Sequence, residues 1–422
     1  MKKQRRDFIK TVGLAGIGLA GGVLSPQSFA FSSAIKDLAM SKNDLSIIGP
    51  YGPWANGLIS KELPSLSFRN ERFTALESWK MEAMSTAKER LGIPDLGKVP
   101  EVTVHDTYVN DGLRFEEISW QLPYGNPTKA LVIKPEGVKG RLPAILAFHD
   151  HGGNKYFGLR KITRTGKAQH PLMIEHQDHY YEGKAWANEI AKRGYVVIVP
   201  DSFTFASRRV LLEEVPENRR GGLTDENPEK EENISAYNKW AADHEHIMAK
   251  SLFCGGTSWP AVFFAEDQVA LEVLLARKDV DPDRVGCGGL SGGGLRTVMM
   301  GGLDHRIKCA VCVGFMSTWT DFLLNRAYTH TWMAYVPRLP NELDFPEILG
   351  LRVPLPTLVL NDIDDQLYTL PEMQKADKIL EAVFDKAGAQ DKYKASYYPG
   401  LHKFDQAMQI EAFEWWDQWL KN

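Results

Sequence analysis

Apolar and polar residues alternate with different periods in different parts of the chain. Over residues 71–91 the apolar positions recur at helical spacing, which predicts a helix. Short runs rich in β-branched and aromatic residues follow, and Gly, Asn and Pro turns separate them. These runs predict strands at residues 102–109, 113–122, 130–133 and 144–148.

Beyond about residue 180, helical patterns alternate with unbroken apolar runs. Helical patterns at residues 183–193 and 262–275 each precede such a run. The apolar runs lie at residues 195–199, 285–288, 309–313, 357–360 and 395–398. A strand that is buried on both faces of a parallel sheet gives a continuous apolar run rather than an alternating one. The predicted fold class is therefore α/β, with a doubly wound, mostly parallel central sheet and helices on both faces.

Two stretches interrupt this alternation and are expected to be loop-like, lid-like insertions. Residues 202–238 are rich in charged residues, and residues 317–345 are rich in aromatic ones. Ligands of such sheets bind outside the carboxyl ends of the strands, so the aromatic insertion is expected to wall a substrate pocket. Trp319 and Trp332 are the candidate pocket residues, and ordinary surface packing is the alternative for each.

Length and composition are those of an ordinary globular enzyme. The chain has 422 residues, of which 43% are hydrophobic and 25% charged, so disorder of the whole chain is excluded. Enzymes of the α/β class often reach this length as one catalytic unit with insertions. We expect an export signal at residues 1–30, a partly helical extension at 31–100 packed on the main domain, and a catalytic domain at 101–422.

The first 30 residues have the composition of a bacterial export signal. Basic residues at positions 2, 3, 5 and 6 precede a run of small and apolar residues at 11–24. A run of about 14 residues is too short to span roughly 30 Å of hydrocarbon. Small residues at positions 28 and 30, Ser28 and Ala30, predict cleavage after Ala30. Residues 5–10 resemble the twin-arginine motif, which predicts export of the folded protein by the twin-arginine machinery.

Export in this way predicts a periplasmic or secreted protein without stable membrane insertion, and an uncleaved anchor is the alternative. The formal net charge is −4, and loss of residues 1–30, with five basic residues and one acidic residue, changes it to −8. Nucleic acid and anionic membrane surfaces are therefore not expected as partners. Four cysteines are too few for a disulfide scaffold, and Cys309 and Cys312 are interpreted as buried strand residues.

The sharpest chemical signal is Gly-Leu-Ser-Gly-Gly at residues 289–293. This Gly-x-Ser-x-Gly follows a predicted strand and opens a predicted helix, so a sharp turn exposes Ser291 as the predicted nucleophile. Glycines are needed at such a turn because backbones approach closely there. A serine hydroxyl is a weak nucleophile at neutral pH, so it needs a base and a carboxylate that orients the base.

The base and the acid are expected in the C-terminal part of the chain, since the order in such sheets is serine, acid, histidine. His402, in a turn between the last predicted strand and the terminal helix, is the predicted base. His305 and His330 also follow the serine, and we interpret them as surface or pocket-wall residues. The acid is expected directly after residues 357–360, where aspartates stand at positions 362, 364 and 365.

An acyl-transfer enzyme also needs backbone N–H groups that stabilise the developing oxyanion. Gly292, directly after the nucleophile, is expected to supply one of them. The second donor is expected from the loop after the apolar run 144–148, where His-Asp-His-Gly-Gly follows. Either His151 or Gly152 would donate, and both registers remain open.

The sequence resembles dienelactone-hydrolase-related and acetyl-xylan-esterase-like α/β hydrolases over roughly residues 71–422. The motifs that carry the resemblance are His-Asp-His-Gly-Gly at 149–153, Asp-Pro-Asp-Arg-Val-Gly at 281–286, Gly-Leu-Ser-Gly-Gly-Gly at 289–294 and Pro-Gly-Leu-His at 399–402. The resemblance implies ester hydrolysis through an acyl-enzyme, without metal or cofactor, often of acetyl or other small acyl groups on plant carbohydrate.

The resemblance also ranks the candidate acids. In such hydrolases the acid commonly stands in a Gly-x-x-Asp pattern, which makes Asp365 the expected acid and Asp364 the alternative. The chain departs from the family at Asp150 and Asp362, which occupy positions where glycine is usual. Dienelactone hydrolase itself uses a cysteine nucleophile where this chain has Ser291, and glucuronoyl esterases carry a Cys-Ser-Arg turn that is absent here.

Two other enzyme classes are alternatives. A serine peptidase could use the same three residues, although no propeller repeats like those of many oligopeptide-cleaving relatives are present in the sequence. A metal-dependent hydrolase would need imidazole ligands beside Asp150. Its candidate ligands are His149, His151, His170, His176, His179, His244 and His246.

Overall fold

The structure is a computed structural model that describes residues 45–59 and 63–421. The predicted export signal, its cleavage site after Ala30 and the first part of the N-terminal extension lie outside these residues. Ser46–Asn422 forms one compact unit. Within the described ranges, no helix combines the length and the apolar character that a membrane crossing requires.

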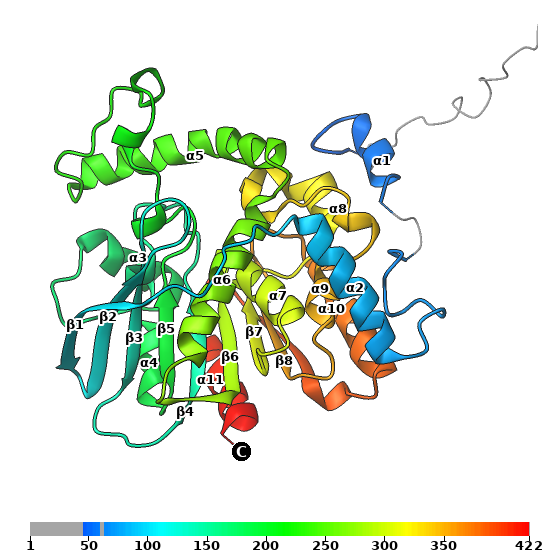
Figure 1. The fold of residues 1–422 in the computed structure, drawn as a ribbon. Coiled ribbons are helices and arrows are strands. Elements are labelled where there is room, and N and C mark those ends of the chain that lie inside the picture. The colour runs from blue at the N-terminus through cyan, green and yellow to red at the C-terminus, as the bar shows by residue number, and fades with distance from the viewer. Residues whose placement is uncertain (1–44, 60–62, 422) are drawn as a thin grey trace, which may run out of the picture. The chain divides into compact units, whose positions relative to one another are not determined.

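The described part of the chain contains one sheet of nine strands, in the order β1-β2-β3-β5-β4-β6-β7-β8-β9 (Figure 1). The strands are β1 (Thr103–Asn110), β2 (Leu113–Trp120), β3 (Thr128–Pro135), β4 (Leu142–Phe148), β5 (Val196–Pro200), β6 (Val280–Leu290), β7 (Cys309–Val313), β8 (Thr357–Asp362) and β9 (Tyr393–Tyr398). β1, β2, β3 and β5 pair antiparallel in that order, and every neighbouring pair from β5 to β9 is parallel. The predicted mostly parallel sheet is confirmed.

Each apolar run that predicted a strand overlaps one. β5, β7 and β8 are buried along their whole length, as a strand covered on both faces must be. β6 begins at Val280, five residues before the predicted run, because Val280 already pairs with Leu142 of β4 ahead of a register shift. Polar residues at that end of β6 hide this extension from a hydrophobicity pattern.

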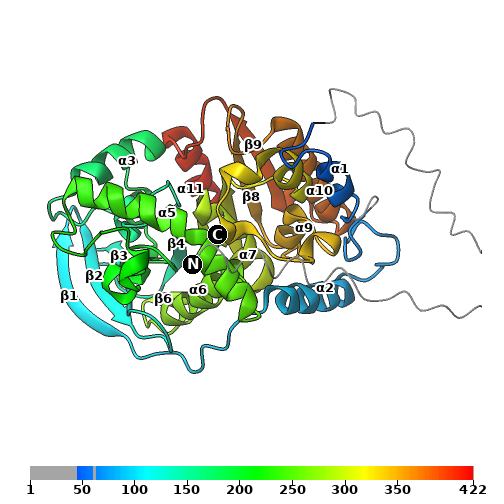
Figure 2. The ribbon, with the colours of Figure 1, turned by 90° about the horizontal axis from the view of Figure 1, so that it is seen from above.

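Eleven α-helices lie in the described residues and cover both faces of the sheet (Figure 2). They are α1 (Tyr51–Asn56), α2 (Leu76–Leu91), α3 (Pro171–Tyr181), α4 (Trp186–Lys192), α5 (Glu231–Cys254), α6 (Trp259–Leu275), α7 (Gly292–Leu303), α8 (Trp319–Asp321), α9 (Phe345–Gly350), α10 (Leu370–Lys386) and α11 (Gln406–Leu420). α2, α6, α7, α9 and α10 contribute to one apolar cluster, and α4 and α11 contribute to the other. The doubly wound arrangement therefore matches the prediction.

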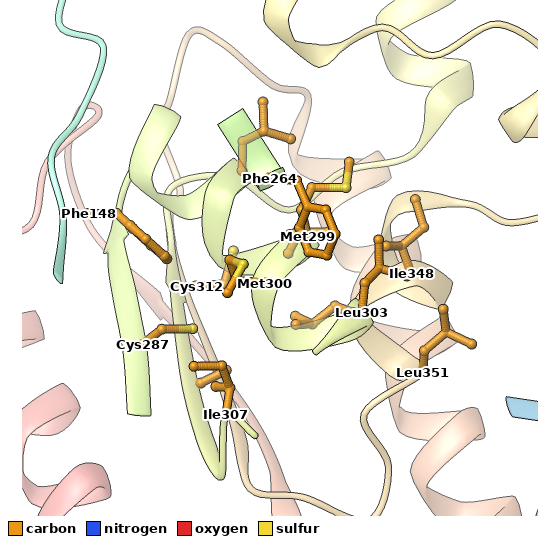
Figure 3. Packing of buried hydrophobic residues seen from close by; sticks show 14 of the residues in the cluster. Phe148, Phe264, Cys287, Met299, Met300, Leu303, Ile307, Cys312, Ile348 and Leu351 are labelled. Carbon is orange, nitrogen blue, oxygen red and sulfur yellow. The ribbon is translucent and has the colours of Figure 1, made fainter. Parts of the chain in front are cut away.

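The first apolar cluster lies between the sheet and helices α6, α7 and α9. Figure 3 shows members of this cluster from four elements: Phe148 of β4, Phe264 of α6, Met299 of α7 and Ile348 of α9. Cys287, Cys309 and Cys312 are buried with free thiols. The interpretation of the Cys-x-x-Cys pair as buried strand residues is confirmed.

The charged insertion at residues 202–238 is only partly a loop, which corrects the prediction. It begins with short 3₁₀ turns, but from Glu231 it enters α5, a helix of 24 residues that crosses above the strands in Figure 1. The buried positions of α5 are spaced like those of an amphipathic helix, but one of them is a glutamate: Ile234, Tyr237, Ala241, Glu245 and Ala249. Because these buried positions include so few apolar residues, the pattern of hydrophobic positions did not predict α5. The aromatic insertion at residues 317–345 does consist of loops and short helical turns.

Candidate active site

Ser291 stands in the sharp turn between β6 and α7. Its backbone has φ 60° and ψ −115°, a strained conformation for a residue with a side chain. The turn is possible because a Cβ at Gly289 or Gly293 would lie only 2.3 Å or 2.5 Å from the carbonyl oxygen of Phe148. The Ser291 N–H donates to Val313 O at 2.9 Å, which ties the turn to β7. The strand-turn-helix context expected for a nucleophilic serine is present.

His402 and Asp365 meet at the same edge of the sheet, in the loops that follow β9 and β8. His402 Nδ1 lies 2.6 Å from Asp365 Oδ2, and Asp365 Oδ1 accepts the N–H of Leu367 at 2.8 Å. Gly314, at the end of β7, makes room for the imidazole, since a Cβ there would lie 2.9 Å from His402 Cε1. The carboxylate therefore fixes which ring nitrogen carries the proton and leaves Nε2 for the pocket.

Asp364, the alternative acid, has a different environment. Its side chain is exposed and its Oδ2 accepts the N–H of Gly400 at 3.1 Å, so it ties together the two loops that carry Asp365 and His402. Asp362 is buried beside His402, and its Oδ2 accepts the N–H of Lys403 at 3.0 Å. Burial raises the pKa of Asp362 to about 7.

The electrostatics of His402 suit a general base. Burial acts to lower its pKa, but the hydrogen bond and the charge of Asp365 outweigh burial, so the pKa of His402 lies above its ordinary value. Its Nε2 is buried and has no hydrogen-bond partner among the described residues. Ser291 and His402 line the same pocket. No hydrogen bond joins their side chains, as is common for catalytic pairs before a substrate binds.

The loop after β4 lies against the first residue of α7. A Cβ at Gly292 would be 3.1 Å from the backbone nitrogen of His151, so the two candidate donors are neighbours. Gly152 and Gly153 have φ of 50° and 63°, which allow the loop to turn at this point. The first N–H groups of a helix have no acceptor within the helix, which leaves the Gly292 N–H available. His151, Gly152 and Gly292 all line the pocket beside Ser291.

A pocket of about 260 Å³ opens above Ser291. It is lined by His151, Gly152, Gly153, Tyr180, Ser291, Gly292, Leu295, Phe315, Thr329, His330, Thr331, Met333, Ala334, Leu367, Tyr368 and His402. This set, drawn from the described residues, contains no lysine, arginine, aspartate or glutamate. Burial lowers the pKa of His330 to about 4, so this ring is neutral at pH 7. The pocket therefore suits a small neutral group, since none of these lining residues is permanently charged.

The two predicted pocket tryptophans lie elsewhere, which corrects that prediction. Trp319 is 4% exposed, stacks on Phe345 with ring centroids 3.8 Å apart, and donates its indole N–H to Leu343 O at 3.1 Å. Trp332 is 37% exposed and packs against Phe253. The insertion needs Trp319 for its own small core, so other residues of the insertion, Thr329 to Thr331 with Met333 and Ala334, form the pocket wall.

Sequence reasoning missed two tyrosines of the pocket. Tyr180 comes from α3, a helix without a clear apolar period, and Tyr368 follows the acid loop. Nothing in the local sequence distinguishes either from a surface tyrosine. His330, interpreted as a surface or pocket-wall residue, does line the wall.

The histidines of the metal-hydrolase alternative do not converge on one point. In the described residues, the one group of three ligand atoms close enough for an ion is Asp362, Asp365 and His402. Two members of that group already bind each other. His149 contacts the backbone oxygen of Asp150, and His151 contacts Glu245. The predicted histidine ligand set is therefore not assembled by the fold.

Comparison with known sequences gives two matches. Residues 256–350, which include Ser291 and α7, match the sequence family described as the prolyl oligopeptidase family. Over 294 residues the chain is 28% identical to the protein of Bacillus subtilis (strain 168) named "Putative hydrolase YtaP". That match covers 69% of this chain and 83% of the relative.

Solved structures decide the fold. A "putative acetyl xylan esterase" from Bacteroides fragilis NCTC 9343 superposes with a TM-score of 0.60 at 16% identity, over 82% of this chain and 81% of that one. The chain has the α/β-hydrolase fold. A glucuronoyl esterase from Solibacter usitatus superposes with a TM-score of 0.55 at 13% identity, over 86% of this chain and 99% of the esterase. In α/β hydrolases the nucleophile stands in a turn between a strand and a helix, and the acid and then the histidine follow it along the chain.

Proposed function

We propose that the protein is a serine carboxylic-ester hydrolase that acts through an acyl-enzyme, with Ser291 as nucleophile, His402 as base and Asp365 as acid. The observation that carries the proposal is the 2.6 Å contact between His402 Nδ1 and Asp365, on the wall of a pocket that also holds the strained Ser291. A serine, a histidine and an aspartate that are distant in sequence are the groups that acyl transfer by such a triad uses, and this supports the proposal.

In the proposed reaction, Ser291 Oγ attacks the ester carbonyl carbon while His402 Nε2 takes its proton. The carbonyl electron pair moves onto the oxygen, and the N–H groups of Gly292 and of the β4 loop, at His151 or Gly152, receive the negative charge. Collapse of the intermediate expels the alkoxide, which takes the proton from His402. Water then repeats the sequence on the acyl group and frees Ser291. Asp365 holds the imidazole and stabilises its charged form.

The pocket favours a small neutral acyl group such as acetyl, on a carbohydrate or another small ester. Its volume of about 260 Å³ is ample for an acetyl group, and its apolar side is formed by residues such as Leu295, Phe315 and Met333. The acetyl-xylan-esterase name of one structural neighbour agrees with this substrate class. An ionised acyl group would lose its hydration without gaining a permanent countercharge.

The direct test is hydrolysis of aryl acetate, longer aryl esters, acetylated xylan and a peptide anilide by residues 31–422. The Ser291→Ala variant, which lacks the proposed nucleophile, is the control. We expect release of acetate from the parent and rates that fall as the acyl chain lengthens. Equal rates for parent and Ser291→Ala would overturn the proposed nucleophile.

A serine peptidase is the second candidate, because residues 256–350 match the prolyl oligopeptidase family. The same triad cleaves amides when the pocket holds a peptide. Turnover of the anilide, without turnover of any ester, would favour this candidate. The matched segment holds the nucleophile turn but neither Asp365 nor His402, so it does not separate the two activities.

We also propose export by the twin-arginine machinery, from the sequence of residues 1–30 alone. Replacement of Arg5 and Arg6 by lysine in the full chain is expected to leave the protein in the cytoplasm of a bacterial host, whereas the parent accumulates outside it and starts at Phe31. Unchanged export of the double variant, or a mature protein that keeps its first residues, would contradict this proposal.

A further inference from the structure

Lys161 is a buried charged residue that the proposed reaction does not use. It ends a short 3₁₀ turn, Leu159–Lys161, and is 0% exposed. Its ammonium group donates to two successive backbone carbonyls, Asp150 O at 2.9 Å and His151 O at 2.8 Å. Both carbonyls belong to the loop after β4 that carries the candidate oxyanion donors.

The geometry of the peptide bond links these two contacts to the oxyanion hole. In a planar trans peptide the C=O and the N–H point in opposite directions. The carbonyl of Asp150 shares a plane with the N–H of His151, and the carbonyl of His151 shares one with the N–H of Gly152. Because Lys161 holds both carbonyls on one side of the loop, both N–H groups face the other side. Gly292 lies on that side, where a Cβ would be 3.1 Å from His151 N.

The ammonium group is itself held in place by Asp150. Asp150 Oδ1 lies 3.9 Å from Lys161 Nζ, while Oδ2 receives His176 Nε2 at 3.0 Å and the Tyr181 hydroxyl at 2.6 Å. All these contacts are buried. They explain why an aspartate stands at a position where a glycine would be expected: its backbone carries the donor loop and its side chain anchors the lysine behind that loop.

We propose that Lys161 is a positioning residue for the oxyanion hole. By donating to the carbonyls of Asp150 and His151, it orients the N–H groups of His151 and Gly152 so that they converge with that of Gly292 on the developing oxyanion. This inference rests on the proposed function. An ammonium group has three donors, so one side chain serves two carbonyls and still faces a carboxylate. Its positive charge behind the loop also polarises both peptides toward the oxyanion in a site of low dielectric constant.

Lys161→Met tests the proposal, because methionine keeps the apolar stem and removes the donors. We expect kcat for an aryl acetate to fall by about 10²-fold with KM nearly unchanged, as for loss of an oxyanion donor. An acetyl-like trifluoromethyl ketone adds to Ser291, with its carbonyl electron pair moving onto oxygen and the serine proton passing to His402. Its inhibition constant is expected to rise by a similar factor. A folded Lys161→Met protein with parental kcat and ketone affinity would overturn the proposal.

Arg352→Met is the matched control. Arg352 is also buried and donates to backbone carbonyls, Gly301 O, Leu355 O and Ile307 O among them, but none belongs to the β4 loop. Its loss is expected to lower the urea midpoint without changing kcat or ketone affinity of the folded protein. A purely structural role for Lys161 would make the two variants behave alike.

Two further measurements test the proposed role of Lys161 even if the Lys161→Met protein does not fold. If Lys161→Met does not fold, Asp150→Asn with Lys161→Met removes both charges and is assayed in the same way. In the parent, a crystal structure of the ketone adduct is expected to place the oxyanion about 2.7–3.1 Å from the backbone nitrogen of Gly292 and from that of His151, Gly152 or both. An oxyanion that contacts neither His151 N nor Gly152 N overturns the proposal. Full activity of Ser291→Ala would instead overturn the proposed function, whatever Lys161→Met shows.

Discussion

The carboxyl ends of β4 and β8 each carry a buried aspartate where glycine is usual in the resembling hydrolases: Asp150 lies in the loop after β4, and Asp362 is the last residue of β8. Asp150 is 1% exposed and Asp362 is 0% exposed, so burial alone does not distinguish them. Asp150 receives hydrogen bonds from His176 and Tyr181 and lies near the ammonium group of Lys161. Asp362 receives one backbone N–H, from Lys403, and its Oδ1 has no partner among the described residues.

The partners give the two carboxyl groups opposite pKa shifts. Burial acts to raise the pKa of Asp150, but His176 and Lys161 outweigh it and hold that pKa well below the usual range. Burial raises the pKa of Asp362 to about 7, because the Lys403 N–H and the charges of His402 and Lys403 lower it too little to offset burial, and the charge of Asp365 raises it further. The comparison shows that neighbouring cations, rather than burial, decide the charge of a buried carboxyl group. The loop after β4 carries a permanent anion, and the end of β8 carries a group that titrates beside the base.

Among the aspartate variants, the largest expected effect is on kcat, and it distinguishes Asp365 from Asp364 in the loop after β8. Asp365→Asn removes the acceptor that orients His402 and is expected to lower kcat by about 10⁴-fold, as loss of a triad aspartate does elsewhere. Asp364→Asn, the matched control, loses only a contact to Gly400 and is expected to change kcat less than about tenfold. Steady-state kinetics on an aryl acetate measure both. Similar losses in the two variants would remove the reason for assigning the acid to Asp365.

The next effect concerns stability in the β4 loop. Asp150→Asn leaves Lys161 buried without its anion and is expected to lower the free energy of unfolding by about 3–5 kcal/mol at pH 7. Because the folded pKa of Asp150 is depressed, its stabilisation is present above the unfolded pKa of about 3.9 and is lost as the pH falls through the folded value. Urea denaturation at pH 7 measures the difference, and a loss below about 1 kcal/mol would contradict the pairing.

Asp362→Asn is expected to show the opposite pH dependence. With a folded pKa of about 7 and an unfolded pKa of about 3.9, Asp362 keeps a proton that the unfolded chain has released, so its contribution to stability falls as the pH rises from 4 to 7. Asparagine removes this cost. Relative to the parent, the variant is expected to gain about 2–3 kcal/mol between pH 5 and pH 8. Urea midpoints at both values test this; a relative loss at pH 8 would show that Asp362 is stabilised as an anion.

The smallest expected effect is on the pH profile of the reaction. His402 acts as a base only when neutral, and its pKa is raised, so kcat/KM is expected to rise with pH through a midpoint above about 6.5. Ionised Asp362 favours the charged imidazole, so Asp362→Asn is expected to move this midpoint down by less than about one pH unit. A flat profile between pH 5 and 8 would count against His402 as the base.

The sequence predicted those parts of the protein that local rules govern. Unbroken apolar runs located the parallel strands, and the turn at Ser291 was recognisable because its glycines have no alternative there. The contacts that tertiary packing creates could not be predicted from the local sequence. Nothing near Lys161 in the sequence indicates that it binds the backbone ten residues earlier. Trp319 looked like a pocket residue because aromatic composition does not reveal whether a ring faces a ligand or the core of its own insertion.

The central claim is that Ser291 forms an acyl-enzyme in this pocket. The most direct test is acetate release from an aryl acetate by parent and Ser291→Ala proteins, with the acylated residue of the parent trapped at low pH and located by peptide mass spectrometry. The account predicts a loss on the order of 10⁶ in kcat for the variant and an acetyl group on the peptide that contains Ser291. Equal rates, or an acetyl group on another residue, would contradict it.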